Sequence, residues 1–375
     1  MRTLKKFIVF LSYFLNAKWV IKLPKKNKFV LVDGIYNPFL KYLKKKDFTI
    51  IHRRGEEINI AILLKCLVKF KFSTLDYFCE FIKCVKPKLI LTAFDYHTIF
   101  YKLSKKTNTK TLMLQKGKRA KGEKFIREKK LFFPKNSKNI FFVDYILVFT
   151  KAVKDFYSRR IGGNYYEIGS FENNFSRPVL SKQKKEIIFI SNFSDPNSSA
   201  SFKTENEDMV AFEIAKLAKK NKIKFNILPR YRKSQSLLDE EKLYYKKMIK
   251  DKIQFIEDKK LTSYEILEKY KFIFASYSTI AQECLVKGIK TGFIMIKSKN
   301  NPAYNFRFGN FEKLKNDGLF WCASTKLEVK KIIKVFNFVI KTNYNDWVKR
   351  TSSYSDKIMK FDYQNKTFNK IISNL

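Results

Sequence analysis

Short apolar runs alternate with longer amphipathic stretches along almost the whole chain of 375 residues. Several of these runs are apolar almost throughout, as strands must be when both faces of their sheet are covered. The amphipathic stretches between them are long enough for helices that cross over from one parallel strand to the next. The pattern therefore predicts an α/β chain built from parallel sheets with helices on both faces.

The predicted strands fall into two series, separated by a stretch without hydrophobic periodicity. The first series is 29–33, 48–52, 88–93, 110–115, 145–150 and 165–170, and the second is 186–191, 223–228, 252–257, 271–276 and 290–296. The stretch between them, SRPVLSKQKK, contains proline, serine and charge. The length of the chain suits two domains, each with its own core. We therefore expect one domain over 1–178 and another over 179–375, with the last helices packing back on the first domain.

Several helices between the strands are expected to start with the same pattern, a hydroxyl residue three positions before an acid. The four pairs are Ser73 and Asp76, Thr204 and Glu207, Thr262 and Glu265, and Thr325 and Glu328. In such a capping box the hydroxyl oxygen accepts a hydrogen bond from the N–H of the acidic residue, whose side chain accepts one from the N–H of the hydroxyl residue. We expect a helix to begin at each pair.

The formal net charge is +44, from 78 lysines and arginines against 34 acids. Such an excess is typical of proteins that bind nucleic acids or anionic membranes. The lysines are spread along the whole chain beside many phenylalanines and tyrosines, as a compositional bias would produce. A biased, solvated surface and a functional basic face are both open interpretations. Arginines are scarcer, and their rigid bidentate fork makes an arginine after a strand a better phosphate ligand than a lysine.

The five cysteines are Cys66, Cys79, Cys84, Cys284 and Cys322. They form no CxxC pair, and with His52 and His97 as the two histidines the sequence has no zinc-ligand spacing. Unpaired cysteines are typical of proteins in a reducing compartment. We therefore expect reduced thiols, a cytoplasmic location, no bound metal and no other cofactor.

An apolar run from Phe7 to Leu15 follows Lys5 and Lys6 near the N-terminus. A charged start before an apolar run resembles the core of a signal peptide, but no small-residue cleavage pattern follows it. The run is too short to span a bilayer. Three interpretations stay open: a secretion signal, a helix on the inner face of the membrane, and an ordinary packed helix. The second would make an anionic membrane a peripheral partner.

Ligands of open α/β sheets bind outside the carboxyl ends of the strands. The sharpest candidate there is FIFASYSTIAQECLVKG, which ends at Gly288 and predicts a buried strand, a loop, a helix and a glycine stop. Ser276, Ser278 and Thr279 gather where the helix begins, and a helix N-terminus offers free N–H groups to phosphate. Glu283 follows one turn later, where it could accept hydrogen bonds from a ribose. The alternative is that Ser278 or Thr279 caps the helix and Glu283 lies on a solvated face.

A second candidate follows the strand at 223–228. Arg230 comes two residues after this strand, and Arg232 two residues later. An arginine beside the same edge of the sheet could neutralise the charge of a departing nucleoside diphosphate. The alternative is that Arg230 is one more surface cation on a basic protein.

Further candidates follow strands of the first series. Asp95 and His97 come after the strand at 88–93, and either could act as general base toward an acceptor hydroxyl. The alternatives are a helix N-cap for Asp95 and a structural role for His97. The other candidates are Gln115, Gly117 and Arg119, in an anion-friendly turn, and Gly169 and Ser170, at the end of the last strand of this series. We expect Gly169 and Ser170 to lie at a cleft between the domains.

Several familiar motifs are absent from the sequence. It contains no GxGxxG fingerprint and no P-loop, so neither common glycine-rich phosphate loop is present. It contains no DxD, which leaves a metal-held diphosphate unsupported. It also lacks GxSxG and any cysteine–histidine pairing that would indicate hydrolysis.

Four segments, in this order, resemble the bacterial surface-carbohydrate biosynthesis proteins, which are similar to glycosyltransferase-B enzymes. The segments are VKPKLILTAFDYH at 85–97, LMLQKGKR at 112–119, EIGSFENN at 167–174 and FASYSTIAQECLVKG at 274–288. The resemblance covers nearly the whole chain from about Trp19 and includes Trp347. Lys116 stands where the turn of the family usually has asparagine, which leaves the role of this turn open.

This resemblance implies two Rossmann-like domains of the glycosyltransferase-B type, with the active cleft between them and the donor bound to the second. The implied function is metal-independent transfer of a sugar from a nucleotide sugar to a glycan or lipid-linked acceptor, in surface polysaccharide or lipopolysaccharide synthesis. One alternative is a nucleotide-sugar epimerase of the same fold. The other is a non-enzymatic basic protein that binds nucleic acid or an anionic surface. Against nucleic acid, the sequence has no RRM, KH or helix-turn-helix signature.

Overall fold

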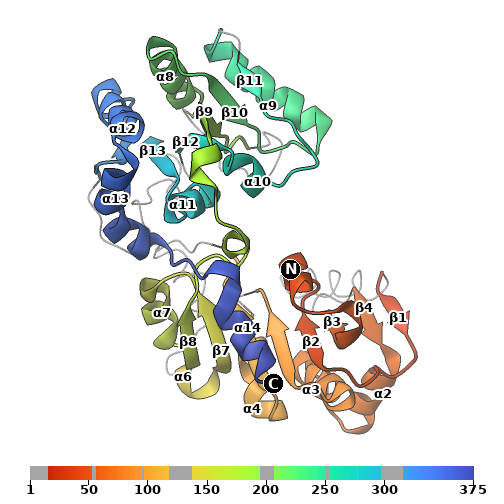
Figure 1. Ribbon diagram of the computed structural model, residues 1–375. Helices are drawn as coiled ribbons and strands as arrows, with labels where there is room; N and C mark the ends of the chain where they lie inside the picture. The colour runs from red at the N-terminus through yellow and green to blue at the C-terminus, as the bar shows by residue number, and fades with distance from the viewer. Residues whose placement is uncertain are drawn as a thin grey trace. The chain divides into compact units, whose positions relative to one another are not determined.

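The computed structural model describes residues 16–52, 56–94, 97–117, 137–194, 207–250, 253–276, 278–296 and 316–375. These residues form two compact units (Figure 1). Unit 1 contains the described residues of 16–117 and 137–172, together with 364–375. Unit 2 contains the described residues of 173–363. Among the described residues the chain enters unit 2 after Glu172 and returns to unit 1 after Tyr363.

The described part of unit 1 holds a six-stranded parallel sheet in the order β3-β2-β5-β6-β7-β8. Its strands are β2 (Phe29–Val32), β3 (Phe48–Ile51), β5 (Leu89–Thr92), β6 (Lys110–Leu114), β7 (Phe142–Val148) and β8 (Gly162–Glu167). Two short strands, β1 (Lys18–Val20) and β4 (Glu57–Asn59), pair with each other apart from this sheet. The helices are α2 (Ile60–Val68), α3 (Thr74–Val85), α4 (Phe100–Thr107), α6 (Ser137–Ile140), α7 (Lys151–Ser158) and α14 (Lys366–Ser373).

The described part of unit 2 holds a second six-stranded parallel sheet, in the order β11-β10-β9-β12-β13-β14. Its strands are β9 (Lys184–Ile190), β10 (Phe225–Leu228), β11 (Gln254–Phe255), β12 (Tyr270–Ala275), β13 (Lys290–Ile296) and β14 (Trp321–Ser324). The helices are α8 (Glu207–Lys220), α9 (Gln235–Met248), α10 (Ser263–Leu267), α11 (Thr279–Val286), α12 (Val329–Lys341) and α13 (Tyr344–Ile358). The predicted α/β class with parallel sheets is confirmed.

Turns of 3₁₀ helix complete the described chain: η1 (Asn37–Lys41), η2 (Lys45–Asp47), η3 (Asn173–Phe175), η4 (Leu180–Lys182) and η6 (Tyr363–Asn365). The last helix, α14, adds an aromatic side chain to the core of unit 1. The ring of Phe368 stacks on that of Phe39 at 5.5 Å and meets that of Phe171 edge-on at 5.0 Å. Asn365, just before α14, donates a hydrogen bond to the carbonyl of Phe171. The residues after the second crossing therefore complete the first unit.

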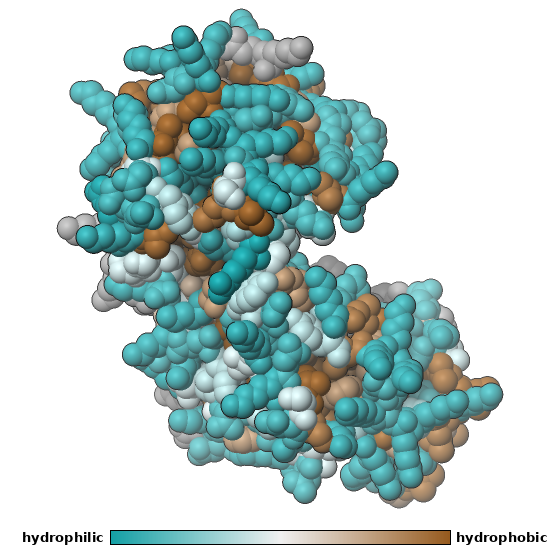
Figure 2. Space-filling model, in the orientation of Figure 1, coloured by the Kyte–Doolittle hydropathy of each residue, from teal (hydrophilic) through white to brown (hydrophobic). Residues whose placement is uncertain are grey.

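Burial explains why the apolar runs form strands. Each of the eleven predicted runs overlaps a strand of the structure, and β2, β5 and β13 are buried along their whole length. Figure 2 shows hydrophilic residues over most of the visible face, with hydrophobic residues in scattered groups between them. The lysine-rich stretches of the sequence therefore supply the covering surface, while the apolar runs supply the sheets.

Two of the four predicted capping boxes are confirmed. Ser73 with Asp76 opens α3, and Thr262 with Glu265 opens α10. The prediction for Thr325 is wrong, because α12 begins at Val329 and its N-cap residue makes no side-chain capping bond. Thr204 lies outside the described residues.

The strand order of each sheet reverses direction once. In unit 2 the chain runs from β9 outward through β10 to β11, and then returns to pair β12 on the other side of β9. In unit 1 β3 and β5 lie on opposite sides of β2 in the same way. Loops leave such a switch point in opposite directions and open a crevice at the carboxyl ends of the strands. The two switch points are therefore where ligand-binding side chains are expected.

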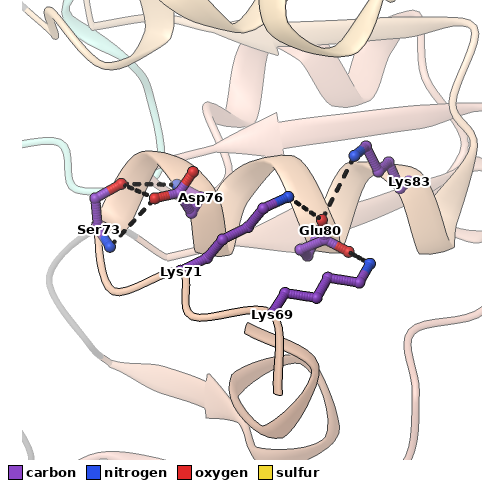
Figure 3. Close-up of polar contacts among 6 residues, drawn as sticks. All are labelled: Lys69, Lys71, Ser73, Asp76, Glu80 and Lys83. Atoms are coloured by element: carbon purple, nitrogen blue, oxygen red, sulfur yellow. Dashed lines mark hydrogen bonds and ion pairs between the residues drawn. The ribbon is translucent and has the colours of Figure 1, made fainter. Parts of the chain in front are cut away.

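Glu80 of α3 holds the turn between α2 and α3 (Figure 3). Its carboxylate lies 2.7 Å from Nζ of Lys69, 3.2 Å from that of Lys71 and 3.4 Å from that of Lys83, and its side chain is only 3% exposed. The hydrogen bond from Lys69 is the largest cause that lowers the pKa of Glu80 to about 2 from its usual 4.5. The buried acid is therefore ionised and held by cations.

Replacing Glu80 with glutamine should lower the free energy of unfolding at neutral pH. Because the folded pKa lies below the unfolded one, the carboxylate stabilises the fold above about pH 4.5, and this contribution is lost as the pH falls toward about 2. Urea unfolding across that range should show the stabilities of the two proteins converging at acid pH. Glu240→Gln, on the exposed surface of α9, is the control. An equal gap between wild type and Glu80→Gln at every pH would contradict the assignment.

Candidate functional site

The switch point of unit 1 brings together the turns that follow β2 and β5. Asp33 and Gly34 follow β2 with positive φ values of 68° and 100°. His97, after β5, is 2% exposed, and its Nδ1 lies 3.7 Å from the carboxylate of Asp33. The hydroxyl of Thr92 donates to the last carbonyl of β2 and accepts a hydrogen bond from the N–H of Phe94, which ties the two turns together. The structure therefore pairs His97 with a carboxylate.

Gln115 follows β6 and links it to the end of β7. Its side-chain carbonyl accepts a hydrogen bond of 2.8 Å from the N–H of Phe149, and its amide donates to the carbonyl of Gly117. The next residue, Lys116, places its ammonium group 5.3 Å from the centre of the Tyr36 ring. The turn after β6 is thus shaped by Gln115 and carries a cation held by an aromatic face.

Four predicted site residues of the first sheet remain, and the structure describes two of them. Gly169 follows β8 with a φ of 72°, a conformation that favours glycine, and Ser170 is 4% exposed. Asp95 and Arg119 lie outside the described residues. His97, Gln115, Gly117, Gly169 and Ser170 all follow strands of one sheet, at its carboxyl edge.

The switch point of unit 2 lies where β9 pairs with β12, and the turn from β12 into α11 carries the predicted hydroxyls. The Ser278 hydroxyl accepts a hydrogen bond from the N–H of Ala281, so Ser278 caps α11 as the alternative interpretation expected. Thr279 is the first residue of α11 and is half-buried. Ser276 is 7% exposed, and its hydroxyl has no hydrogen-bond partner among the described residues. A buried hydroxyl of this kind is expected to have a partner, protein or ligand.

Glu283 is buried, with 4% exposure, so the interpretation that places it on a solvated face is wrong. Its Oε2 accepts a hydrogen bond of 2.7 Å from the hydroxyl of Tyr264 in α10. Asn173 donates to the backbone carbonyl of Glu283, which fixes this turn of α11 within unit 2.

The two arginines after β10 have different surroundings. Arg230 extends its guanidinium toward the end of β9, where it donates to the carbonyls of Asn192 and Phe193 at 3.4 and 3.2 Å. Arg232 donates to the carbonyl of Leu261 and to the hydroxyl of Ser263, so it anchors the loop before α10. Arg230 therefore lies beside the switch-point strand β9, whereas Arg232 has a structural role.

Two buried acids beside β9 were not among the candidate site residues of the sequence analysis. Glu207, the first residue of α8, accepts hydrogen bonds from the N–H of Asn192, and its exposure is 3%. Glu241 of α9 is fully buried and accepts from the N–H groups of Arg230 and Tyr231. Each acid therefore fixes one of the loops that leave β9 and β10. The sequence indicated Glu207 only as part of a predicted helix start and gave no signal for Glu241, because the two acids lie on different helices and become neighbours only when these helices pack.

The hydroxyls of Ser191 and Tyr245 link these two acids, because the side chain of Ser191 also forms a hydrogen bond with Glu241. The Tyr245 hydroxyl lies 2.9 Å from the hydroxyl oxygen of Ser191 and 3.2 Å from a carboxyl oxygen of Glu207. The Tyr245 hydroxyl can donate its one proton to either oxygen, and its oxygen can accept a hydrogen bond from the Ser191 hydroxyl or from a protonated Glu207. Burial raises the pKa of Glu207 to about 8, in agreement with this arrangement, and burial also raises the pKa of Glu241. The chain of hydroxyls thus holds a proton beside the carboxyl end of β9.

The described residues contain no group of three or more histidines, cysteines, aspartates or glutamates that could hold a metal ion. Within the same ranges no helix is both long and apolar enough to cross a membrane. The apolar run from Phe7 to Leu15 lies outside them. The five cysteines are free thiols, and four of them are buried.

The chain is similar to several solved structures. The wall teichoic acid polymerase TagF matches with a TM-score of 0.50 and 11% identity, over 93% of this chain and 89% of that chain. The pneumococcal O-GlcNAc transferase GtfA, in complex with UDP and GlcNAc, matches with a TM-score of 0.46 and 12% identity, over 81% of this chain and 60% of that chain. Accessory secretory proteins 1, 2 and 3 of Streptococcus pneumoniae match with a TM-score of 0.46 and 14% identity, over 80% and 55%. The chain thus spans little more than half the length of the last two.

No curated protein sequence matches this chain. At these identities the structural similarity concerns the fold, and the expected class of two Rossmann-like domains of the glycosyltransferase-B type is confirmed. Residues 112–375 match the model of one protein family, described as "putative O-antigen biosynthesis protein". The matched range includes the turn after β6 and the whole turn from β12 into α11. Since the match covers more than half of the chain, the protein belongs to this family of O-antigen biosynthesis proteins.

Proposed function

We propose that the protein transfers a sugar from a nucleotide-activated donor, without a bound metal ion, in the synthesis of surface polysaccharide. The observation that carries this proposal is the turn from β12 into α11. It lies at the switch point of the second sheet and combines a buried hydroxyl, a helix N-terminus and a buried carboxylate one turn later. These are the groups that a pyrophosphate and a ribose require.

Each part of the donor has a proposed ligand in unit 2. The N–H groups of α11, with the hydroxyls of Ser276, Ser278 and Thr279, bind the phosphates. Glu283 accepts hydrogen bonds from the ribose hydroxyls. Arg230 stabilises the negative charge that develops on the departing nucleoside diphosphate, because its guanidinium lies beside β9 at the same edge of the sheet.

The acceptor is proposed to be a glycan or a lipid-linked sugar. Its hydroxyl must lose a proton during transfer, and His97 can take this proton on a nitrogen of its neutral imidazole. The carboxylate of Asp33, 3.7 Å away, stabilises the positive charge that forms on the ring. Asp95 is the second proposed base. We place the reaction in the cytoplasm, with peripheral contact between the protein and an anionic membrane.

The first test is thermal unfolding of the full chain with UDP-, GDP-, dTDP- and CMP-sugars at moderate salt. One of these nucleotides should raise the melting temperature selectively, since saturating ligand at about 100 times its Kd adds about 2.7 kcal/mol. No shift with any donor, beside tight salt-sensitive binding of DNA, would overturn the proposal in favour of a basic binding protein. Conversion of the donor without an acceptor would instead indicate an epimerase.

Thr279→Ala should weaken binding of the selected donor about tenfold, the effect of losing one hydrogen bond to a charged group. Calorimetric titration measures the change. Ser353→Ala, which removes a hydroxyl from the exposed surface of α13, is the matched control and should bind normally. Equal affinity in the wild type and Thr279→Ala would remove Thr279 from the site.

A further inference from the structure

The helix α2 is apolar on two faces, but only one of them packs on other described residues. Ile62 and Cys66 are buried, at 0% and 2% exposure. On the other side Leu64, Leu67 and Val68 are 54%, 44% and 80% exposed. A helix at the surface of a soluble domain normally turns a polar face to water. The exposed apolar face of α2 therefore indicates a partner that the isolated chain lacks.

The end of α2 continues this apolar surface at an unusual backbone position. The N–H of Phe70 donates to the carbonyl of Leu67 and that of Lys71 to the carbonyl of Cys66, which is the Schellman ending of a helix. In this motif Phe70 takes the left-handed conformation, with a φ of 53°, where glycine is preferred. Its side chain is 85% exposed. Of the non-glycine residues with positive φ in the described chain, it alone is apolar.

Residues 69–72 alternate between lysine and phenylalanine. The two lysines contact Glu80, whereas the two phenylalanines are exposed. Lys69 and Lys71 both turn toward Glu80, with which they form ion pairs of 2.7 and 3.2 Å (Figure 3). Phe70 and Phe72 are 85% and 74% exposed. One buried carboxylate thus holds the two cations against α3 while both aromatic rings remain in water. The fold of the turn presents the rings outward.

We call the exposed apolar residues of α2 and its turn the apolar tip. It comprises Leu64, Leu67, Val68, Phe70 and Phe72. Figure 2 shows hydrophobic beside hydrophilic surface at the end of unit 1 that carries β1 and α2. Between Ile60 and Val85, which form α2, the turn and α3, the cations are Lys65, Lys69, Lys71 and Lys83, against the acids Asp76 and Glu80. The apolar tip is therefore surrounded by net positive charge.

We propose that the apolar tip inserts into the surface of an anionic phospholipid bilayer, with the surrounding lysines at the depth of the lipid phosphates. Protein interfaces are depleted in lysine, whereas a membrane surface accommodates lysines that alternate with aromatic side chains. Each lysine near an anionic surface adds attraction, and each buried phenylalanine adds apolar contact. The side chains of Val68, Phe70 and Phe72, which are 80%, 85% and 74% exposed, project from the protein, as insertion requires. The proposal is independent of the donor site, because vesicle binding needs no sugar nucleotide.

Sedimentation of the full chain with sucrose-loaded vesicles tests the proposal. The wild type should bind vesicles of phosphatidylglycerol and phosphatidylcholine, and bind phosphatidylcholine alone much more weakly. Phe70→Gly should lower the partition coefficient about tenfold, the effect of one phenylalanine side chain. It should not lower the melting temperature, because glycine suits the left-handed position. If Phe70→Gly stays folded but loses vesicle binding, the loss is caused by reduced lipid insertion and not by unfolding.

Leu243→Ser is the matched control, since it removes an apolar side chain that is 59% exposed on α9 of unit 2. It should leave the partition coefficient unchanged. Binding that disappears in moderate salt and is equal in wild type and Phe70→Gly would overturn the proposal, because a general basic surface would then explain it. Light scattering checks for a second contradicting outcome. If the wild type self-associates but does not bind vesicles, and Phe70→Gly abolishes the self-association, the partner of the apolar tip is a second copy of the chain.

Discussion

Alanine in place of Glu283 should lower the affinity for the nucleotide sugar about 100-fold, because a charged acceptor of two ribose hydroxyls is lost. The carboxylate is 4% exposed and lies one turn inside α11, where a ligand seated on the helix N-terminus would present its ribose. Calorimetric titration with the donor selected by thermal unfolding measures this effect. A loss of this size would exceed that of any single hydroxyl in the same turn.

The controls separate ligand binding from the structural role of the same carboxylate. Tyr264→Phe removes the hydrogen bond that Glu283 accepts at 2.7 Å but keeps the carboxylate, so it should change the affinity little. Glu240→Ala, on the exposed surface of α9, should have no effect. If Tyr264→Phe weakened binding as much as Glu283→Ala, the pair would be structural and Glu283 would not be a donor ligand.

The unfolding free energy should fall as the pH rises from about 5 to about 8. Burial raises the folded pKa of Glu207 to about 8 from 4.5, so the folded state keeps a proton that the unfolded state releases in this range. Each pH unit inside the window therefore costs about 1.4 kcal/mol of stability. Above about pH 8 both states are ionised at this residue, and the decline ends. Urea unfolding at several pH values measures the slope.

Glu207→Gln should flatten this pH dependence and match or exceed the wild type in stability at pH 8. The glutamine amide can donate to Tyr245 as the protonated acid does, and its carbonyl can accept from the N–H of Asn192. Glu241→Ala is the contrasting variant, because it leaves the N–H groups of Arg230 and Tyr231 without their acceptor, at about 1–3 kcal/mol each. A wild type whose stability rises across the window would contradict the protonated Glu207.

Most strands were predictable because buried strands occur in the sequence as continuous apolar runs. Those runs correspond to β2, β3 and β5 to β13, whereas β1, β4 and β14 were not predicted. The three missed strands have three or four residues each, too short to show a period. The helix start predicted at Thr325 was wrong for a related reason. A capping box is a local pattern, whereas the packing of α12 on β13 and β14 places the helix start three residues later.

The candidate site was predictable only where its residues directly follow a strand. Ser276, Ser278, Thr279 and Arg230 were found in this way, and Asp33 could have been, since it ends the first predicted strand. Glu241 could not, because the charged sequence around it is typical of a solvated helix face. Its burial depends on how α9 packs against α8 and the end of β9, which no local pattern encodes.

The return of the chain to unit 1 after Tyr363 sets the order in which the protein can be completed during synthesis. All strands of the first sheet leave the ribosome before any strand of the second sheet, yet Phe368, which stacks on Phe39, emerges after the whole second sheet. Unit 2 can therefore close its core while unit 1 still exposes the aromatic surface that α14 covers. A nascent chain stalled before Gln364 would carry a finished second unit and an unfinished first one.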